Sequence, residues 1–304
     1  MALFISVMEQ GLIYAIMALG MYITYKILDF PDMTVDGSFP LGAAISAILI
    51  AKGMNPYATL AVSFVVGLAA GTVTGLIHVK LKVRDILASI IMMTGLYSVN
   101  LRIAGRANLP IYTNDNVFSN PVMDGIFHES PFQVVIIMVV FTVLIKLAVD
   151  WYLSTKSGYL LKAVGDNETI VTSMGVDKGK VKILGLAIAN GLVSLSGCLY
   201  VQQQRYFDIS MGVGTAVIGL ASVIIGTSLF GQVGLLNFSV SVILGSILYK
   251  ACVALAIKFG LAASDMKLVT AVLFLAIIVI SRQLEAMKSN VAKASIQSAR
   301  STRC

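Results

Sequence analysis

The residues best suited to chemistry stand in one polar segment between two apolar runs. Residues 29–40 read Asp-Phe-Pro-Asp-Met-Thr-Val-Asp-Gly-Ser-Phe-Pro and hold three carboxylates, two hydroxyls and two prolines. Pro31 and Pro40 cannot donate a helix hydrogen bond, and Gly37 admits a positive φ. The segment therefore predicts an interrupted helix whose polar side chains could face a substrate or form a gate.

Two interpretations of this segment remain open. Non-helical backbone at membrane depth is tolerated only where it is buried in protein or lines water, so the break could line a transport pathway. It could instead be an ordinary cytoplasmic turn that Asp36 and Ser38 cap. The candidate pathway or gate residues are Asp32, Thr34, Asp36, Gly37 and Ser38.

A second segment repeats the pattern in the other half of the chain. Residues 32–37 read Asp-Met-Thr-Val-Asp-Gly, and residues 208–214 read Asp-Ile-Ser-Met-Gly-Val-Gly. Each follows an apolar run and precedes a short one. The copies lie an odd number of predicted spans apart, which implies opposite orientations, and inverted repeats with interrupted helices recur in transporters. Asp208 and Ser210 therefore join the candidate pathway residues.

The loop over residues 158–177 carries a different signal. Asp166 or Asn167 can cap a short helix that Gly175 ends. The helix would present a small apolar patch made of Ile170, Val171 and Met174. Such a helix suits docking of a partner subunit, or else it rests on lipid headgroups. The candidate coupling residues are Gly165, Asn167, Glu168, Ile170, Val171, Ser173, Met174 and Gly175.

Signatures of catalysis are missing from the sequence. His78 and His128 are isolated, and residues 175–180 lack the glycine spacing and the hydroxyl of a phosphate loop. We therefore expect no catalytic residue, no metal and no cofactor bound by this chain. The ionisable residues within apolar runs are Glu9, Lys146, Asp150, Lys250 and Lys258. They form no dense proton relay, which favours an external source of energy.

The elements that would position these residues are membrane spans. Apolar residues make up 58% of the 304-residue chain and charged residues 12%, a balance that lipid accommodates and a soluble core does not. Apolar runs occupy residues 3–28, 39–51, 57–79, 86–104, 132–153, 183–201, 213–230, 238–259 and 268–280. The first is expected to be a retained span. The second, seventh and ninth are short for a crossing, so we expect them to be broken, tilted or re-entrant.

Basic residues predict the orientation. They gather at residues 80–84, 156–182 and after 282, the positive-inside pattern, so the net charge of +7 indicates a membrane protein and no nucleic-acid partner. With nine crossings the N-terminus lies outside. We expect a transmembrane domain over residues 1–282, with a cytoplasmic loop at 154–182, and a basic cytoplasmic tail over 283–304. The face made of Gly67, Gly71 and Gly75 predicts close helix packing.

Several of these segments together resemble one family. The run Gly11–Gly20 with the break that follows it, the loop Gly158–Gly175, and the glycine-rich region Gly219–Gly231 are similar to segments of ABC importer permeases of the branched-chain amino acid and ribose type. Their order and spacing carry the likeness, which covers most of the chain. Residues 32–43 are closest to a bacterial subgroup often assigned to aromatic amino acids such as tryptophan or tyrosine.

The resemblance implies an all-α, polytopic membrane bundle of about eight or nine spans, similar to type II ABC importers, in the bacterial plasma membrane. It implies a homodimer around one central pathway, with two cytoplasmic ATPase subunits that bind ATP and Mg and an extracytoplasmic substrate-binding lipoprotein. Residues 167–174 would enter a cleft on the ATPase, and residues 32–38 would lie near the pathway.

The expected function is ATP-driven import of a small polar solute, an amino acid, with an aromatic one as the narrower expectation. The alternatives are an ion-coupled secondary transporter or channel that works without an ATPase, and a structural membrane scaffold.

Overall fold

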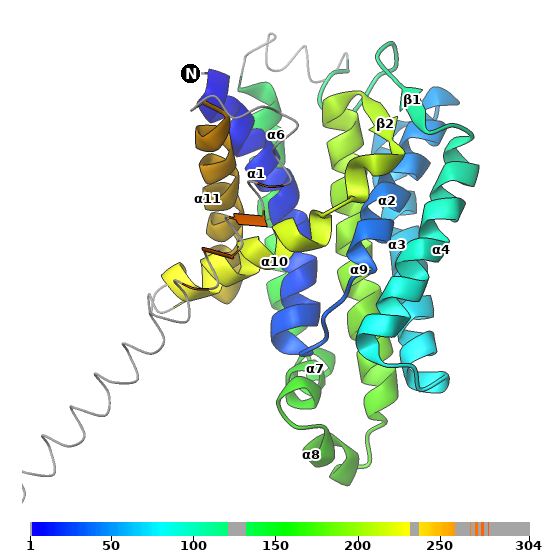
Figure 1. Ribbon diagram of the computed structural model, residues 1–304, viewed down its shortest axis with the longest axis vertical. Coiled ribbons are helices and arrows are strands. Elements are labelled where there is room, and N and C mark those ends of the chain that lie inside the picture. The colour runs from blue at the N-terminus through cyan, green and yellow to red at the C-terminus, as the bar shows by residue number, and fades with distance from the viewer. Residues whose placement is uncertain are drawn as a thin grey trace, which may run out of the picture.

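The computed structural model describes residues 2–120, 132–231 and 237–258, and six single residues between 268 and 279 (Figure 1). Within the described residues, seven helical segments are long and apolar enough to cross a bilayer, and a shorter apolar helix spans Val35–Ala51. The predicted polytopic helical bundle is confirmed. Seven of the thirteen residues of the ninth predicted run lie outside the described residues, and the basic tail over 283–304 lies entirely outside them.

The helices that form the bundle are α1 (Ala2–Met21), α2 (Val35–Ala51), α3 (Pro56–Lys80), α4 (Asp85–Ala104), α6 (Gln133–Leu153), α9 (Lys178–Gln204), α10 (Thr215–Ile225) and α11 (Phe238–Lys258). The shorter elements are η1 (Tyr22–Ile27), β1 (Asn108–Pro110), α7 (Lys156–Asp166), α8 (Glu168–Ser173), β2 (Tyr206–Asp208), η2 (Ile209–Gly212) and η3 (Gly226–Phe230). The second predicted run is the short α2, and the seventh is divided among η2, α10 and η3. The sequence pattern did not predict α7.

Local sequence signals explain where two long helices begin. The Asn55 side chain accepts a hydrogen bond from the Tyr57 amide at 2.9 Å, and Pro56 takes the first position of α3, where no N–H is needed. At the start of α9, Asp177 Oδ1 accepts from the Gly179 amide at 2.8 Å. These caps set the lengths of the two helices that pack most extensively on each other.

Helix α9 lies at the centre of the bundle, between α1, α2 and α3. The predicted glycine face of α3 makes one of these contacts. A Cβ added at Gly67, Gly71 or Gly75 would lie 2.5, 2.2 or 2.9 Å from an α9 backbone atom. Because a real Cβ does not approach so closely, only glycine allows this helix pair to form, and the predicted packing role is confirmed.

Helix α2 crosses α9 at an equally short distance. An added Cβ at Gly42 would lie 1.8 Å from the Ser194 carbonyl oxygen, and one at Gly197 would lie 1.9 Å from the Phe39 carbonyl oxygen. A glycine of each helix thus lies against the backbone of the other helix. The crossing holds α2 in a fixed position on α9.

The two ends of the bundle carry different elements (Figure 1). The N-terminus lies at the same end as the β1–β2 ribbon, whose antiparallel register pairs Leu109 with Phe207. The helices α7 and α8 lie at the opposite end, as does the turn between α3 and α4 that carries the basic residues 80–84. The N-terminus and the basic loops therefore lie on opposite sides, as the charge pattern predicts.

Two helices begin inside the bundle rather than at its ends. After η1, residues 28–34 turn back along α1 without helical structure, and α2 starts part of the way up (Figure 1). After β2, the short η2 leads inward from the other end to the start of α10. We call the segment around residues 28–38 the first break and the segment around residues 208–214 the second break. The first break is not a turn at the bundle surface. The two breaks approach each other from opposite ends, as an inverted repeat requires.

Candidate functional site

The two breaks share the same local turn. In the first, Asp32 Oδ1 accepts a hydrogen bond from the Thr34 amide at 2.8 Å. In the second, Asp208 Oδ1 accepts from the Ser210 amide, also at 2.8 Å. A short Asp side chain that binds the backbone two residues later forms an Asx turn. The repeated Asp-x-hydroxyl pattern thus has one structural meaning at both positions.

Asp36 joins the two breaks to each other. Its Oδ1 accepts from the Ala216 amide at 2.7 Å and from the Thr215 hydroxyl at 3.0 Å, and its Oδ2 accepts from the Gly214 amide at 3.1 Å. These donors belong to the first turn of α10, whose amides lack partners within the helix. A carboxylate is favourable at a helix N-terminus, so Asp36 caps α10 from a different helix. We call this arrangement the Asp36 cap.

The backbone next to the Asp36 cap is also interlocked. Pro40 has no N–H, so within α2 it leaves the Asp36 carbonyl without its helical partner. Gly212 approaches that carbonyl, since an added Cβ at Gly212 would lie 2.1 Å from the Asp36 oxygen. The proline and the glycine together allow the end of the second break to rest on the start of α2.

Asp32 is the centre of a buried polar network. Asn190 of α9 donates from Nδ2 to Asp32 Oδ2 at 2.7 Å, and the Ser38 hydroxyl donates to Asn190 Oδ1 at 2.7 Å. Asp32 is 2% exposed, and Asn190 and Ser38 are fully buried. Among the described residues, no lysine or arginine forms an ion pair with Asp32. Amide and hydroxyl donors therefore satisfy the carboxylate, as a buried polar group requires.

The remaining residues of the first break are tied to neighbouring helices. The Thr34 hydroxyl lies 3.2 Å from the Thr74 hydroxyl of α3, and Asn100 Nδ2 of α4 donates to the Gly37 carbonyl at 3.0 Å. The interpretation of this segment as a turn capped by Asp36 and Ser38 is wrong. Both side chains bind partners on other helices, because α2 begins inside the bundle, where its first turn is surrounded by α9 and α10.

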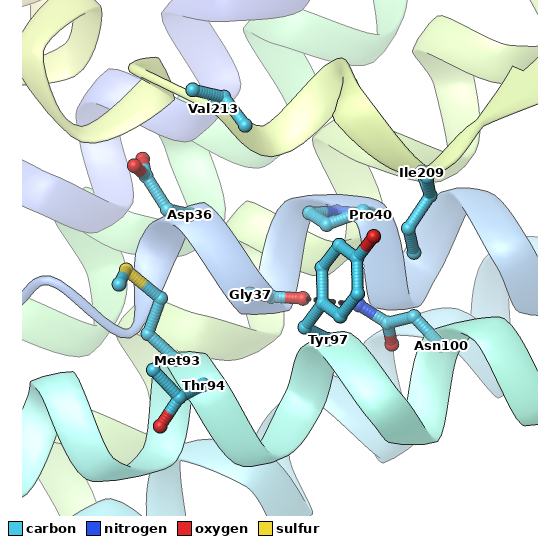
Figure 2. A pocket seen from close by; sticks show the side chains of 9 residues that line it. All are labelled: Asp36, Gly37, Pro40, Met93, Thr94, Tyr97, Asn100, Ile209 and Val213. Atoms are coloured by element: carbon cyan, nitrogen blue, oxygen red, sulfur yellow. Dashed lines mark hydrogen bonds between the residues drawn. The ribbon is translucent and has the colours of Figure 1, made fainter. Parts of the chain in front are cut away.

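A cavity of about 330 Å³ opens beside the first break (Figure 2). It is lined by Asp36, Gly37, Pro40, Met93, Thr94, Tyr97, Asn100, Ile209 and Val213, and we call it the α2–α4 cavity. Its size lies at the lower end of the ~300–1,000 Å³ range of small-molecule sites. Of the seven predicted pathway residues, only Asp36 and Gly37 line it. Asp32, Thr34 and Ser38 are buried outside its lining.

Asp208 and Ser210 do not join this group. Asp208 lies in β2 at the end of the bundle that carries the N-terminus, where Asn108 Nδ2 donates to its Oδ2 at 3.4 Å. The hydrogen bonds from Ser210 keep the pKa of Asp208 below its ordinary value. The second break therefore meets the first through the Thr215 hydroxyl and the backbone of Gly212, Gly214 and Ala216, and not through its own carboxylate.

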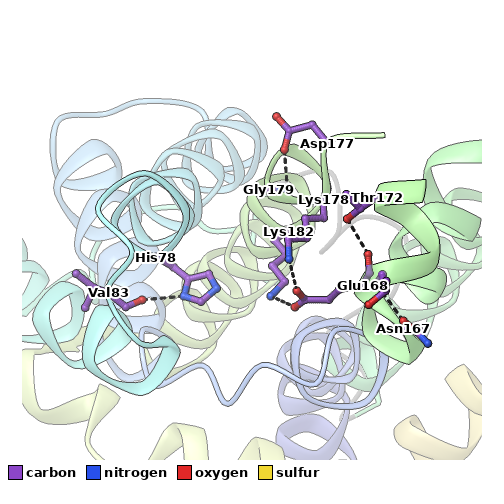
Figure 3. Close-up of polar contacts among 10 residues, drawn as sticks. His78, Val83, Asn167, Glu168, Thr172, Asp177, Lys178, Gly179 and Lys182 are labelled. Atoms are coloured by element: carbon purple, nitrogen blue, oxygen red, sulfur yellow. Dashed lines mark hydrogen bonds and ion pairs between the residues drawn. The ribbon is translucent and has the colours of Figure 1, made fainter. Parts of the chain in front are cut away.

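The short helix predicted in the loop over residues 158–177 is present as α8 (Figure 3). Asn167 caps it, with Oδ1 accepting from the Thr169 amide at 3.0 Å, and Gly175 follows with φ +76°. Glu168 forms ion pairs with Lys178 at 2.7 Å and Lys182 at 2.5 Å. Its hydrogen bonds to these lysines of α9 lower the pKa of Glu168 to about 2. Glu168 thus fastens α8 to α9 rather than pointing away from the protein.

The apolar patch predicted on α8 is smaller than expected. Ile170 and Met174 are 55% and 66% exposed, whereas Val171 is fully buried. Including Val171 in the exposed patch was wrong, because the helix turns that side chain toward the bundle. Ser173 donates to the Ile170 carbonyl within the helix at 2.7 Å. The exposed apolar surface at α8 and its end consists of Ile170 and Met174.

Gly165 lies outside α8, near the end of α7, and contacts the first break directly. A Cβ added there would lie 1.7 Å from the Ile27 carbonyl oxygen at the end of η1. The backbone of the coupling segment therefore rests on the residue from which the break begins.

Asn190 and Asn100 are functional candidates that the sequence reasoning missed. Asn100 is the one amide side chain of α4, and Asn190 is the one amide of α9 that precedes the three glutamines at its end. Amides in membrane helices commonly bind across helices, which was the available signal. Among the described residues, no group of three or more His, Cys, Asp or Glu side chains could hold a metal ion.

Comparisons with known proteins identify the family to which the chain is similar. The family described as branched-chain amino acid transport system, permease component, matches residues 3–281. The chain is 40% identical over 289 residues to the tyrosine transport system permease protein of Clostridioides difficile, with 95% of each chain covered. It is 27% identical to the ribose import permease protein RbsC of Escherichia coli, covering 75% of this chain and 70% of the relative. No solved structure gives a significant match.

The match covers nearly the whole described bundle, including both breaks and α8. The relatives named above are transport permeases. The chain therefore belongs to the ABC transport permeases of the branched-chain amino acid family, as a multi-pass transport subunit of the plasma membrane and not an enzyme.

Proposed function

We propose that the chain is the membrane subunit of an ATP-driven importer that carries an amino acid with an aromatic side chain into the cytoplasm. The observation that carries the proposal is the 40% identity, over 95% of both chains, to a tyrosine transport permease. The ribose permease is more distant, at 27% identity. Relatives with sugars as substrates show that the family alone does not decide the solute.

The proposed assembly is a homodimer with two cytoplasmic ATPase subunits, which bind ATP and Mg, and an extracytoplasmic binding lipoprotein. The exposed Ile170 and Met174 support an ATPase contact, because two apolar side chains stand on a short helix held rigidly by the Glu168 ion pairs. On this proposal the chain binds no cofactor itself.

The geometry supports a route by which the ATPase could act on the pathway. Closure of the ATPase subunits would push α8, which the Glu168 ion pairs connect to α9. Because the backbone at Gly165 contacts the Ile27 carbonyl, a displacement of this segment would also move the start of the first break. The Asp36 cap then links α2 to α10, and the two interrupted segments would move together. ATP drives such a change only through its different affinity for the two states.

The test measures how much ATPase subunit co-purifies with the permease, and it measures solute uptake. The permease is co-expressed with its ATP-binding subunit and purified, with Ile170→Glu and Met174→Glu as variants. We expect both to lose most of the ATPase while still inserting in the membrane. Met54→Glu is the matched control, since Met54 is 42% exposed in the α2–α3 turn at the other end.

Two results would contradict the proposal. Normal ATPase recovery with both α8 variants would overturn the coupling assignment. Uptake of L-tyrosine by the chain alone in proteoliposomes, driven by an ion gradient and unaffected by ATP, would make it a secondary transporter. Val171→Pro should lose the ATPase as well, because it breaks the short helix on which Ile170 stands.

A further inference from the structure

One polar atom beside the α2–α4 cavity has no partner in the part of the chain that the structure describes. Asn100 is fully buried and lines the cavity (Figure 2). Its Nδ2 donates to the Gly37 carbonyl at 3.0 Å, but its Oδ1 accepts no hydrogen bond. A buried acceptor without a donor is unfavourable, so each one calls for an explanation such as a ligand.

The rest of the lining defines the chemistry of such a ligand. Asp36 brings a negative charge, and its Oδ2 accepts only one bond, which leaves room for another donor. Among the described residues no lysine, arginine or histidine lines the cavity, so its lining does not suit an anion. The other walls are mainly apolar or aromatic, including Met93, Tyr97 and Ile209.

The position of the cavity connects it to both interrupted segments. Its lining combines the start of α2, one side of α4, and the residues that lead into α10. Tyr97 is 53% exposed and Val213 is 58% exposed, so the cavity opens at the surface of the protomer. A solute between two protomers could therefore enter it without unfolding either break.

We propose that the α2–α4 cavity holds the solute in transit, with the ammonium group of an amino acid donating to Asn100 Oδ1. The apolar body of the solute lies against Tyr97 and Met93. This inference rests on the proposed function and narrows it: the permease itself selects a cationic amino group joined to an apolar or aromatic body. A sugar supplies neither feature.

The experiment uses the complete complex, with permease, ATPase and binding protein reconstituted in proteoliposomes and L-tyrosine as the solute. Asn100→Leu removes both the donor and the acceptor at similar size, whereas Asn100→Asp keeps the acceptor. We expect Asn100→Leu to reduce the uptake rate at saturating binding protein at least about tenfold, while ATP hydrolysis continues. Asn100→Asp should stay within about threefold of the unmodified protein.

Asn114→Leu is the matched control. Asn114 also donates to a carbonyl of α2, that of Ile50 at 3.2 Å, but it does not line the cavity. It should transport normally. Val213→Trp fills the cavity without altering Asn100, and it should reproduce the loss of uptake even if Asn100→Leu fails to fold.

The outcomes separate the possibilities. Equal loss with Asn100→Leu and Asn100→Asp would assign the effect to the bond with Gly37 and overturn the proposal. Normal uptake with Asn100→Leu or Val213→Trp would show that water or lipid fills the cavity, and this result would also overturn the proposal. No L-tyrosine uptake by the unmodified complex would instead contradict the proposed function.

Discussion

The two interrupted segments contain the same turn in opposite surroundings. In the first, the Asp32 carboxylate is 2% exposed and is bound by Asn190 of the central helix. In the second, Asp208 is partly exposed at the end of the bundle, and beyond its own turn it meets only the distant donor of Asn108 among the described residues. A repeated sequence pattern thus reproduces local geometry, whereas burial decides whether the carboxylate also connects helices.

This comparison predicts that carboxylates of the first break matter far more than that of the second. The largest effect is expected at Asp36, which lies in the first break but caps a helix of the second. Asp36→Ala leaves the first amides of α10 without an acceptor and should lower the free energy of unfolding by about 2–4 kcal/mol. L-Tyrosine uptake should be abolished. Thermal unfolding in detergent and uptake by the reconstituted complex measure the two effects.

Asp85→Ala is the control for Asp36. Asp85 also lies in the first turn of a helix, but its side chain binds only the neighbouring Ile86 amide, at 3.0 Å. It should change stability by less than about 0.5 kcal/mol. Equal destabilisation by the two variants would show that the Asp36 cap has no special role.

The next largest effect is expected in the Asp32 network. Asp32→Ala and Asn190→Ala should each cost about 1–3 kcal/mol, because each leaves a buried partner unsatisfied. The double variant should cost less than the sum of the two, with a coupling energy of about 0.5–3 kcal/mol in a double-mutant cycle. Additive costs would mean that the 2.7 Å contact between the two side chains contributes nothing.

A smaller effect is expected in the second break. Asp208→Ala removes an Asx turn at a partly exposed position, so the cost should stay below about 1 kcal/mol, with uptake within about twofold of the unmodified protein. The same two assays apply. A loss as large as that of Asp32→Ala would remove the contrast between the two breaks.

The smallest expected effect is the pH dependence of stability that the exposed carboxylates Glu168 and Asp208 contribute. The pKa of Glu168 is lowered from 4.5 to about 2, so its ion pairs stabilise the protein fully above about pH 4.5 and are lost as the pH falls toward 2. The lowered pKa of Asp208 has the same sign. Between pH 7 and 5, Glu168→Gln and the unmodified protein should therefore differ in Tm by a constant amount. A difference that shrinks within this range would contradict the ion pairs at Glu168.

Local features of the fold could be predicted from the sequence to a large extent. Glycine spacing indicated the face of α3 that meets α9, and Asn167 with Gly175 indicated the short α8. These signals act within one or two helical turns. The turn shared by Asp32 and Asp208 belongs to the same class.

Contacts between distant segments could not be predicted in this way. Asp36 and Ser38 looked like caps of their own helix, but their partners are α10 and Asn190, which lie far along the chain. The burial of Val171 likewise depends on how α8 rests on the bundle. Periodicity within one segment carries no information about which helix it will face.

The Asp36 cap also has a consequence for how the protein is made. The backbone amides of α10 that donate to Asp36 lie as many as 180 residues further along the chain. At a synthesis rate of ~5–20 residues per second, a ribosome needs roughly 10 to 40 seconds to produce that length of chain. During this interval a carboxylate that belongs inside the bundle has no α10 to bind.

The short helix α2 begins part of the way through the bundle, and both the amide of Asn190 and the first turn of α10 are synthesised long after it. The contacts that fix the start of α2 can therefore form only when the second half of the chain is present. The first break thus sets an order for the assembly of the bundle.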